Sequence, residues 1–417
     1  MTVHLSRNDQ QMLDGRFGPG CQMAMRIVVR LAEACGVAEL MDVTQAHIDG
    51  CGLLSESSLF FAETLAGKGA KVSIPTTLSM GPLDLQNWQK FNIDPSYADK
   101  AIRQGRAYES MGCIPTWTCA PYQSYLTPRF GQQIAWGESN AVVYANSVLG
   151  ARTNRYADFH DICAATTGRV PMCGLHLQEN RKGQVLLQLI GIQADQMQGD
   201  DFYAALGYLI GIRTLNQIPV IDGMPTKVTS DNLKALGAAA ASSGAVMLFH
   251  AVGITPEAAT LDQACHGDKP HRVVEVTLQD IQLARKELST AVKADHVDAV
   301  VLGCPHFSFD EFRQLARCIR TNQARHIGPA TRFIVKTSRT SYSLIRQNEM
   351  LDLFEDFGIE ITLDTCVFHT PILEPDTKVI MTNSGKCAYY APGELGVKVA
   401  FGSMQQCVDS AVKGCVC

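Results

Sequence analysis

"VDAVVLGCPH" (Val297–His306), "DEFRQLARCIR" (Asp310–Arg320) and "TRFIVKTS" (Thr331–Ser338) follow one another closely along the chain. The first and third are short apolar runs typical of buried strands, and the middle one carries apolar residues at helical spacing. A strand, a helix and a second strand in this order are typical of a parallel sheet. The three segments therefore predict an α/β fold.

The same alternation of helical and strand-like segments extends over the whole chain. Helices are predicted in Gln22–Gly36, Ser57–Gly69, Asp231–Gly244 and Leu278–Ala291, and strands in Leu40–Asp49, Ala70–Leu78 and Ala245–Thr255. A chain of 417 residues is too long for one ordinary core. We therefore expect mainly parallel sheets arranged in approximate lobes 1–130, 131–250 and 251–417.

Composition excludes several classes of protein. The chain is 46% hydrophobic and 18% charged, with a net charge of -5, so neither nucleic acid nor an anionic membrane surface is an expected partner. It contains no long uncharged apolar stretch typical of a transmembrane helix. The first residues, "MTVHLSRNDQQMLDGRFGPG", lack the apolar core of a secretory signal. The sequence thus predicts a cytoplasmic protein.

Fifteen cysteines are present, and no two have the CxxC spacing of zinc ribbons or ferredoxins. In a reducing compartment most should be buried thiols. Four of them nevertheless fall in predicted strand-end loops: Cys51, Cys119, Cys304 and Cys366. In open α/β sheets, ligands bind beyond the carboxyl ends of strands.

The loop cysteines leave three interpretations open. Cys119, Cys304 and Cys366 could hold an iron–sulfur cluster with one iron open to a substrate oxygen. Alternatively, they are ordinary buried cysteines, which their spacing alone favours. A third possibility is a nucleophilic thiol, for example Cys304 with His306 as its base.

The stretch "WGESNAVVYANSVLGARTNR" (Trp136–Arg155) combines a small apolar run with many hydrogen-bonding groups. Buried polar groups need partners, so these side chains either bond one another or bind a polar ligand. Glu138 could hold a substrate ammonium or act as acid or base, or it could simply favour a helix N-terminus. Arg152 and Arg155 could bind a carboxylate or tie loops together.

Two glycine-containing loops and one lysine complete the candidates. "HIDGCG" (His47–Gly52) and "TTLSMG" (Thr76–Gly81) could approach an anionic ligand closely, although ordinary tight turns are the commoner use of such glycines. Lys386, in "TNSGKCAYYAPG", could fix a carboxylate or phosphate, whereas most lysines are solvated. Lys336 and Arg339 form a second, weaker basic pair.

Several of these motifs together carry a resemblance to a known family. "AHIDGC", "PTTLSMGPLDL", "TCAPY", "WGESNAVVYANSVLGARTNR", "HAVGITPEA", "GCPHFS" and "MTNSGK" occur in this order. The set resembles the large, catalytic component of aconitase X from about residue 5 to about residue 413. The resemblance implies an aconitase-like catalytic core of several α/β/α lobes, lacking the swivelling domain.

The resemblance also implies a chemistry and a set of site residues. The expected activity is that of a hydro-lyase with an iron–sulfur cluster as Lewis acid, in a 2Fe–2S, 3Fe–4S or 4Fe–4S form. The implied cluster ligands are Cys119, Cys304 and Cys366. The implied substrate contacts are Gly50, Cys51, Gly52, Ser79, Met80, Glu138, Ser139 and Lys386, of which Glu138, Ser139 and Lys386 are also implied to be catalytic.

Two activities are known for the family, the dehydration of mevalonate 5-phosphate and that of cis-3-hydroxy-L-proline. The phosphomevalonate branch tends to read "SGVS" and "TTLNP" where this chain reads "DGCG" and "TTLSM". This departure favours cis-3-hydroxy-L-proline as substrate and 1-pyrroline-2-carboxylate as product. A phosphomevalonate dehydratase large subunit is the alternative within the family.

The sequence ends at Cys417 without the smaller swivelling domain that closes the site in relatives. We therefore expect a separate small subunit, and a heterodimer as the active form. Two alternatives of other classes stay open: a non-catalytic subunit that holds a cluster, and a thiol enzyme that uses Cys119 or Cys304 without a cluster.

Overall fold

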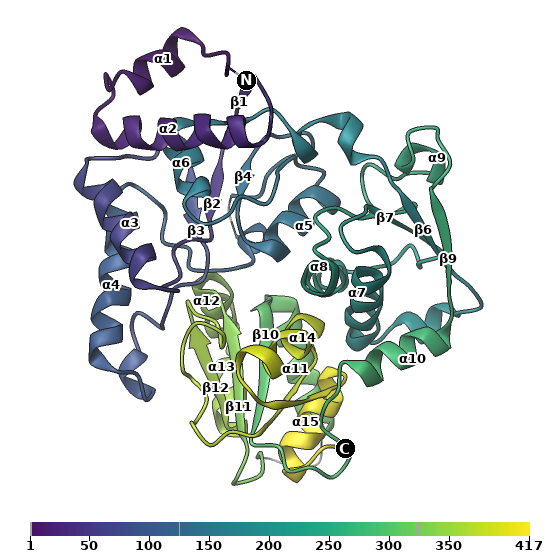
Figure 1. Ribbon diagram of the computed structural model, residues 1–417. Coiled ribbons are helices and arrows are strands. Elements are labelled where there is room, and N and C mark those ends of the chain that lie inside the picture. The colour runs from purple at the N-terminus through teal and green to yellow at the C-terminus, as the bar shows by residue number, and fades with distance from the viewer. Residues whose placement is uncertain (1, 125, 323–325) are drawn as a thin grey trace. The chain divides into compact units, whose positions relative to one another are not determined.

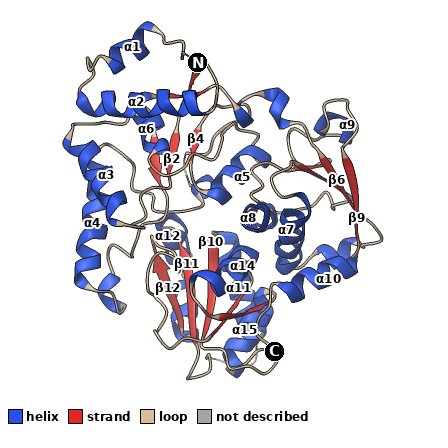
Figure 2. Ribbon diagram, in the orientation of Figure 1, coloured by secondary structure: helices blue, strands red, loops and turns tan. Residues whose placement is uncertain are grey.

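The computed structural model describes residues 2–124, 126–322 and 326–417. The chain divides into two compact units, Met1–Lys182 (unit 1) and Gly183–Cys417 (unit 2). Figure 1 traces both units along the chain, and Figure 2 distinguishes their helices from their strands. Each unit combines helices with parallel strands, which confirms the predicted α/β class with mainly parallel sheets.

Unit 1 is built on a small parallel sheet of order β3-β2-β4. Its strands are β2 (Ala46–Ile48), β3 (Thr76–Leu78) and β4 (Ala135–Trp136). A second, antiparallel pair joins β1 (Leu40–Asp42) to β5 (Arg169–Pro171). The helices are α1 (Arg7–Leu13), α2 (Pro19–Ala34), α3 (Glu56–Gly67), α4 (Pro95–Ser110), α5 (Ser139–Ser147) and α6 (His160–Thr167).

Helix α2 illustrates how the sequence specifies the helices of unit 1. Pro19 occupies the first turn, where its missing N–H costs no hydrogen bond. Apolar residues recur at helical spacing, so Ala24, Val28 and Ala32 all lie on one buried face. The helix predicted in Gln22–Gly36 is therefore confirmed, and it starts three residues earlier than predicted.

One strand of unit 1 is much shorter than its sequence suggests. The apolar run Ala70–Leu78 predicts a strand, yet only β3 at its end is paired in the sheet. The Val72 N–H donates to the Met111 carbonyl at 2.9 Å, and the Ser73 N–H donates to the Ala165 carbonyl at 2.9 Å. These amides bond to a helix end and to another helix, so the first part of the run is an irregular segment.

Unit 2 contains two parallel sheets. The larger has the order β12-β11-β10-β13-β14 and the smaller the order β8-β7-β6-β9. The larger consists of β10 (Ala299–Phe307), β11 (Arg332–Thr337), β12 (Ile359–Leu363), β13 (Val379–Thr382) and β14 (Lys398–Phe401). The smaller consists of β6 (Val185–Leu189), β7 (Pro219–Asp222), β8 (His250–Ala251) and β9 (Arg272–Val276).

Nine helices of unit 2 lie in its described residues. They are α7 (Asp200–Thr214), α8 (Ser230–Gly244), α9 (Leu261–Ala264), α10 (Leu278–Glu287), α11 (Phe309–Thr321), α12 (Arg339–Gln347), α13 (Leu351–Phe357), α14 (Gly385–Glu394) and α15 (Met404–Lys413). Most begin with a hydroxyl side chain that accepts the N–H of the residue three positions on, as Ser308 does for α11 at 3.0 Å.

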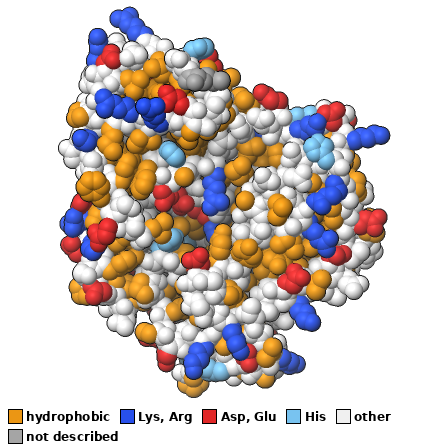
Figure 3. Space-filling view, viewed as in Figure 1, with side chains coloured by type: hydrophobic (Ala, Val, Ile, Leu, Met, Phe, Trp, Pro, Cys, Tyr) orange, Lys and Arg blue, Asp and Glu red, His pale blue; other side chains and the backbone are white. Residues whose placement is uncertain are grey.

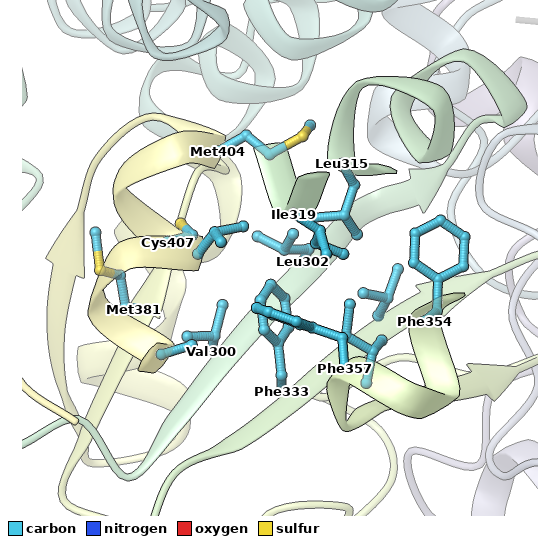
Figure 4. Packing of buried hydrophobic residues seen from close by; sticks show 14 of the residues in the cluster. Val300, Leu302, Leu315, Ile319, Phe333, Phe354, Phe357, Met381, Met404 and Cys407 are labelled. Atoms are coloured by element: carbon cyan, nitrogen blue, oxygen red, sulfur yellow. The ribbon is translucent and has the colours of Figure 1, made fainter. Parts of the chain in front are cut away.

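The strand, helix and strand predicted between Val297 and Ser338 form the centre of the larger sheet. Strand β10 pairs in parallel with β11, and α11 connects them. Phe333 and Leu302 are fully buried, and Leu315 and Ile319 of α11 belong to the same apolar cluster (Figure 4). Burying one such side chain stabilises the fold by about 1.5–3 kcal/mol. This core fixes the strand ends on which several predicted site residues lie.

The surface carries charges of both signs. Lys and Arg side chains are scattered among Asp and Glu side chains over the face drawn in Figure 3. None of the helices in the described ranges is long and apolar enough to span a bilayer.

Candidate active site

In unit 1 the loop after β2 contains Gly50, Cys51 and Gly52. Its backbone carbonyls bond to buried side chains of α4: the Tyr108 hydroxyl donates to the Gly50 carbonyl at 2.9 Å, and the Gln104 amide donates to the Gly52 carbonyl at 2.9 Å. Gln104 also reaches the Gly50 carbonyl at 3.1 Å. The glycines predicted to contact substrate thus lie in a braced loop.

The second predicted loop, with Ser79 and Met80, lies against the first. The Ser79 N–H donates to the Ile48 carbonyl at 2.9 Å. The Cys51 thiol donates to the carbonyls of Ile48 at 3.3 Å and Met80 at 3.7 Å. Burial, together with the charges of nearby carboxylates, raises the pKa of Cys51 well above its usual value. Cys51 is therefore a neutral thiol that joins the two loops.

Glu138 and Ser139 start helix α5, and both side chains are buried. One Glu138 carboxylate oxygen accepts the Ala141 N–H at 2.7 Å, and the other accepts the Ser139 hydroxyl at 3.2 Å. The helix N-terminus therefore stabilises a negative charge here. This is the capping role that the sequence offered as one alternative for Glu138, and a capping carboxylate is also held in a fixed orientation.

Cys119 lies in the loop that Asn140 of α5 holds in place. The Asn140 amide donates to the Cys119 carbonyl at 2.9 Å, and its oxygen accepts the Tyr122 hydroxyl at 3.0 Å. The Tyr122 ring stacks on that of Tyr144, with centroids 3.7 Å apart. Part of the polar block around Glu138 is thus used to place a predicted cluster ligand.

Other members of the polar block have structural partners. The Asn146 amide donates to the Thr153 carbonyl at 3.0 Å, and its oxygen accepts an Arg181 N–H at 3.1 Å. Arg152 donates to the side chain of Gln178 and to the His176 carbonyl, the latter at 3.5 Å. For Arg152 the geometry favours the loop-tying alternative over carboxylate binding.

Two buried ionisable groups of unit 1 are not among the candidate site residues that the sequence motifs indicate. His47 on β2 bonds through Nδ1 to the Thr77 hydroxyl at 2.8 Å, and burial lowers its pKa to about 4, with the Glu138 charge opposing the shift. Asp161 on α6 is fully buried, and its burial raises the pKa to about 8. His47 stood inside a quoted motif, but nothing in the sequence around Asp161 indicated a role.

In unit 2, Cys304 lies near the end of β10 and is buried. A hydrogen bond from the Cys387 thiol, helped by the charges of Lys336 and Lys386, lowers the pKa of Cys304 to about 6 in spite of burial. The Ser384 hydroxyl donates to the Cys304 carbonyl. Cys304 therefore has the character of a thiolate, the form that binds metals.

Cys366 follows β12 and lies close enough to Cys304 for their charges to interact. Burial raises its pKa, and the Lys336 charge opposes the shift. The His306 ring donates through Nε2 to the Thr365 carbonyl at 2.9 Å, so His306 ties the end of β10 to the Cys366 loop. This hydrogen bond gives His306 a bracing role beside the two cysteines.

Lys386 lies in the first turn of α14, two residues after the cap residue Ser384. Its charge lowers the pKa values of both Cys304 and Cys366. Lys336 of β11 is fully buried and acts on the same two cysteines. The structure thus brings Cys304, Cys366 and Lys386 together, along with Lys336 and Cys387, at one end of the larger sheet.

A cavity of about 40 Å³ lies beside Cys304 within unit 2, with room for a few water molecules. Its wall includes Lys234, which is paired with Asp231 at 3.0 Å and with Glu311. Lys234 also donates to the His306 carbonyl at 3.3 Å. This buried ion group supports the backbone next to Cys304.

The donor chemistry around Cys304 fits an iron–sulfur cluster. All fifteen cysteines are free thiols, as predicted for a reducing compartment. Cys304 and Cys366 are neighbouring soft donors, and nearby lysines compensate the negative charge of thiolates. Among the described residues, no three His, Cys, Asp or Glu side chains are grouped so as to hold a metal ion. The predicted third ligand, Cys119, belongs to unit 1.

Comparison with protein-family models gives three matches along this chain. The model of the aconitase X first domain matches residues 2–179, that of the second domain residues 183–286, and that of the third domain residues 297–413.

Comparison with individual proteins finds relatives that match nearly the whole of this chain. A cis-3-hydroxy-L-proline dehydratase of Pseudomonas aeruginosa is 42% identical over 97% of this chain and 69% of its own length, and one of Hypocrea jecorina is 41% identical over 99% and 69%. A phosphomevalonate dehydratase large subunit of Methanothermobacter thermautotrophicus is 37% identical over 96% of both chains. The crystal structure of Thermococcus kodakaraensis aconitase X in its holo-form superposes with a TM-score of 0.87 at 29% identity, covering 98% of this chain and 100% of that one.

Proposed function

This chain belongs to the aconitase X family of dehydratases, and we propose that it is the large subunit of an iron–sulfur enzyme that converts cis-3-hydroxy-L-proline into 1-pyrroline-2-carboxylate. The observation that carries the proposal is the grouping of Cys304, Cys366 and Lys386 at one end of the larger sheet of unit 2. Thiolate donors can hold an iron–sulfur cluster, and a fixed positive charge can stabilise the negative charge that develops during dehydration of a hydroxy acid.

The cluster is proposed to bind through Cys119, Cys304 and Cys366, in a 2Fe–2S, 3Fe–4S or 4Fe–4S form. When bound, it would supply a Lewis acid for the C3 hydroxyl, which is otherwise a poor leaving group. Lys386 would pair with the substrate carboxylate and stabilise the negative charge that develops beside C2 as its proton is removed.

Glu138 and Ser139 would contact the other end of the substrate. The Glu138 carboxylate, held by the N-terminus of α5 and by the Ser139 hydroxyl, would pair with the ring ammonium. Gly50, Cys51 and Gly52 would line the site together with Ser79 and Met80. Loss of the C2 proton and the C3 hydroxyl as water leaves an enamine, which tautomerises to the cyclic imine acid.

A separate small subunit is part of the proposal. Relatives named large subunits match this chain over nearly their whole length, 96% in the case of Methanothermobacter thermautotrophicus. Those names imply small subunits as partners, and we propose such a partner for this chain. It would close the site and provide the base that removes the C2 proton.

The same match makes phosphomevalonate dehydratase the second candidate function. It is favoured by the 37% identity to a phosphomevalonate dehydratase large subunit, whereas the higher identity of 41–42% favours hydroxyproline. Lys386 would then pair with the carboxylate of mevalonate 5-phosphate, so the residues of unit 2 serve either substrate.

The first test is the iron and acid-labile sulfide content of anaerobically purified protein. We expect wild type to carry both, and Cys119→Ala, Cys304→Ala and Cys366→Ala each to lose them. Cys163→Ala in unit 1 and Cys265→Ala in unit 2 are matched controls, since both are buried cysteines outside the proposed site. A wild type free of iron in the presence of its partner contradicts the proposal and favours a thiol enzyme.

The second test assays the complex with cis-3-hydroxy-L-proline and with mevalonate 5-phosphate. Formation of 1-pyrroline-2-carboxylate from the first compound is the expected result. Turnover of mevalonate 5-phosphate alone would contradict the substrate assignment and leave the dehydratase assignment standing.

A further inference from the structure

A fully buried carboxyl side chain, that of Asp161, bonds to the backbone of the loop that is proposed to bind the substrate. One of its oxygens accepts the N–H of Asp49 at 2.7 Å and that of Gly50 at 3.2 Å. The other accepts the N–H of Ile162 at 2.6 Å. Both oxygens are therefore engaged by backbone amides, and two of these three amides belong to the loop after β2.

The segment leading to Glu138 packs on the same carboxyl group. A Cβ atom added at Gly137 would lie 2.9 Å from the Asp49 Cβ, 2.9 Å from the Tyr156 carbonyl oxygen and 3.1 Å from the Asp161 Oδ2. Backbone and a buried side chain leave no space for it, so only glycine fits between β4 and α5. Asp161 thus lies where the loop and the start of α5 meet.

The loop is held from both sides by two helices. Its amides bond to Asp161 of α6, whereas its carbonyls bond to Tyr108 and Gln104 of α4. Hydrogen bonds to both polar faces of a short backbone segment fix its rotation as well as its position. The ionisable groups that face Asp161 are Asp158, Cys51, Tyr108, Cys113 and Cys163, all of them acids.

We propose that Asp161 is a positioning residue that sets the loop Asp49–Gly52 against Gly137 and Glu138. It thereby shapes the part of the substrate site that unit 1 contributes, a role that rests on the proposed function of that loop. Backbone amides hold the Asp161 carboxyl group, and the same oxygen accepts both N–H groups of the loop. Alanine in its place leaves the Asp49 and Gly50 N–H groups without this acceptor, so both loop contacts are lost.

The test uses Cys51 as a reporter within the loop. Its buried thiol donates to the Ile48 and Met80 carbonyls, so its alkylation by iodoacetamide requires the loop to open. In cluster-free full-length protein, we expect Asp161→Ala to accelerate Cys51 alkylation roughly tenfold or more, as read by peptide mass spectrometry. Cys113 and Cys163, buried in the same unit, should keep their wild-type rates.

A matched control replaces a buried carboxylate elsewhere in unit 1. Asp9 accepts the Ser6 N–H at 2.9 Å and pairs with Arg169. Asp9→Ala therefore loses comparable contacts outside the loop and should leave the Cys51 rate unchanged. Tyr108→Phe removes only the hydroxyl that donates to the Gly50 carbonyl, and it should accelerate Cys51 alkylation by a smaller factor. This variant keeps the test decisive if Asp161→Ala does not fold.

Kinetics of the active complex provide a second readout. A displaced loop weakens substrate binding, so we expect Asp161→Ala to raise KM by a larger factor than it lowers kcat. If wild type does not turn over hydroxyproline, the proposed function fails, whereas Cys51 alkylation still reports on the loop. Unchanged Cys51 alkylation in folded Asp161→Ala, or equal acceleration at Cys113 and Cys163, would overturn the positioning role.

Discussion

The two units hold the residues of the proposed site by different means. In unit 1 the sheet strands have only two or three residues, and the loops that follow them are fixed by buried side chains such as Asp161 and Gln104. In unit 2 the nine residues of β10 are buried along the whole strand, and its apolar core fixes the strand end. Hydrogen bonds thus fix the loops of unit 1, and apolar packing fixes the end of β10 in unit 2.

This difference separates two kinds of contribution to a reaction. A loop fixed by individual hydrogen bonds can match the shape of one substrate, because each bond is worth only about 0.5–1.5 kcal/mol and can change during evolution. A rigid strand end suits the cysteines and lysines, whose mutual electrostatics depend steeply on distance. We therefore expect changes in unit 1 to alter substrate fit and changes in unit 2 to alter chemistry.

The largest expected effect is the loss of the Lys386 charge. Because Lys386 would stabilise charge formed only in the transition state, Lys386→Met should lower kcat by about 100- to 1000-fold. Iron and sulfide content should stay near that of wild type, because the cysteines are intact. Both are measured on the purified complex, the first by steady-state kinetics and the second by chemical analysis.

Lys398→Met is the matched control for this prediction. Lys398 is the first residue of β14 and is exposed, whereas Cys304 lies near the carboxyl end of β10 and Lys386 lies beyond that of β13. Loss of the Lys398 charge should leave kcat unchanged. A normal kcat in Lys386→Met would show that unit 2 provides cysteine ligands without a catalytic charge. The expectation that changes in unit 2 alter the chemistry would then be wrong for this lysine.

The sequence predicted candidate site residues where these follow the carboxyl end of a predicted strand. The alternation around Val297–Ser338 predicted parallel strands, and the carboxyl ends of such strands meet at one edge of a sheet. That rule was enough to group Cys304 and Cys366 as candidates, and the motif "TNSGKCAYYAPG" indicated Lys386, to which the resemblance to aconitase X assigned a catalytic role. These residues lie in short motifs directly after apolar runs, so a local pattern marks them.

Asp161, Gln104 and Tyr108 could not be found in this way. They come from helices far along the chain from the loop that they hold, and they act on its backbone, which leaves no pattern in the loop's own sequence. The strand predicted in Ala70–Leu78 is shorter than expected for a related reason. Its amides bond to carbonyls of distant segments, and such tertiary partners override local strand preference.

The second prediction concerns the pH dependence of unit 1. Burial and the charges of Arg181 and Arg152 lower the pKa of His176 to about 4. The folded state therefore stays neutral while the unfolded state, with a pKa near ~6.5, takes up a proton as the pH falls. The contribution of His176 to stability is fully present above pH ~6.5. The free energy of unfolding should fall by about 2 kcal/mol per such histidine between pH 7 and pH 5.

Denaturant unfolding of the full chain at the two pH values measures this loss. His176→Gln should remove the His176 share, so the difference between pH 7 and pH 5 becomes about 2 kcal/mol smaller than in wild type. His271→Gln, at an exposed position of unit 2, is the control and should change nothing. An undiminished difference in His176→Gln would show that the buried polar network of unit 1 is not the acid-sensitive part of the molecule.

The smallest expected effect compares two helix caps within unit 2. The Ser384 hydroxyl accepts the Cys387 N–H at 3.0 Å and donates to the Cys304 carbonyl, whereas the Ser403 hydroxyl only caps α15, accepting the Gln406 N–H at 3.3 Å. Ser384→Ala and Ser403→Ala should each cost about 1 kcal/mol of stability. Only Ser384→Ala loses a contact to a proposed cluster ligand, so it alone should speed the release of iron to a chelator, by roughly tenfold. Equal iron release from both variants would mean that packing of β10 holds Cys304 without help from the cap. The placement of cluster ligands in unit 2 would then rest on its apolar core alone, and the contrast with the hydrogen-bonded loops of unit 1 would be sharper still.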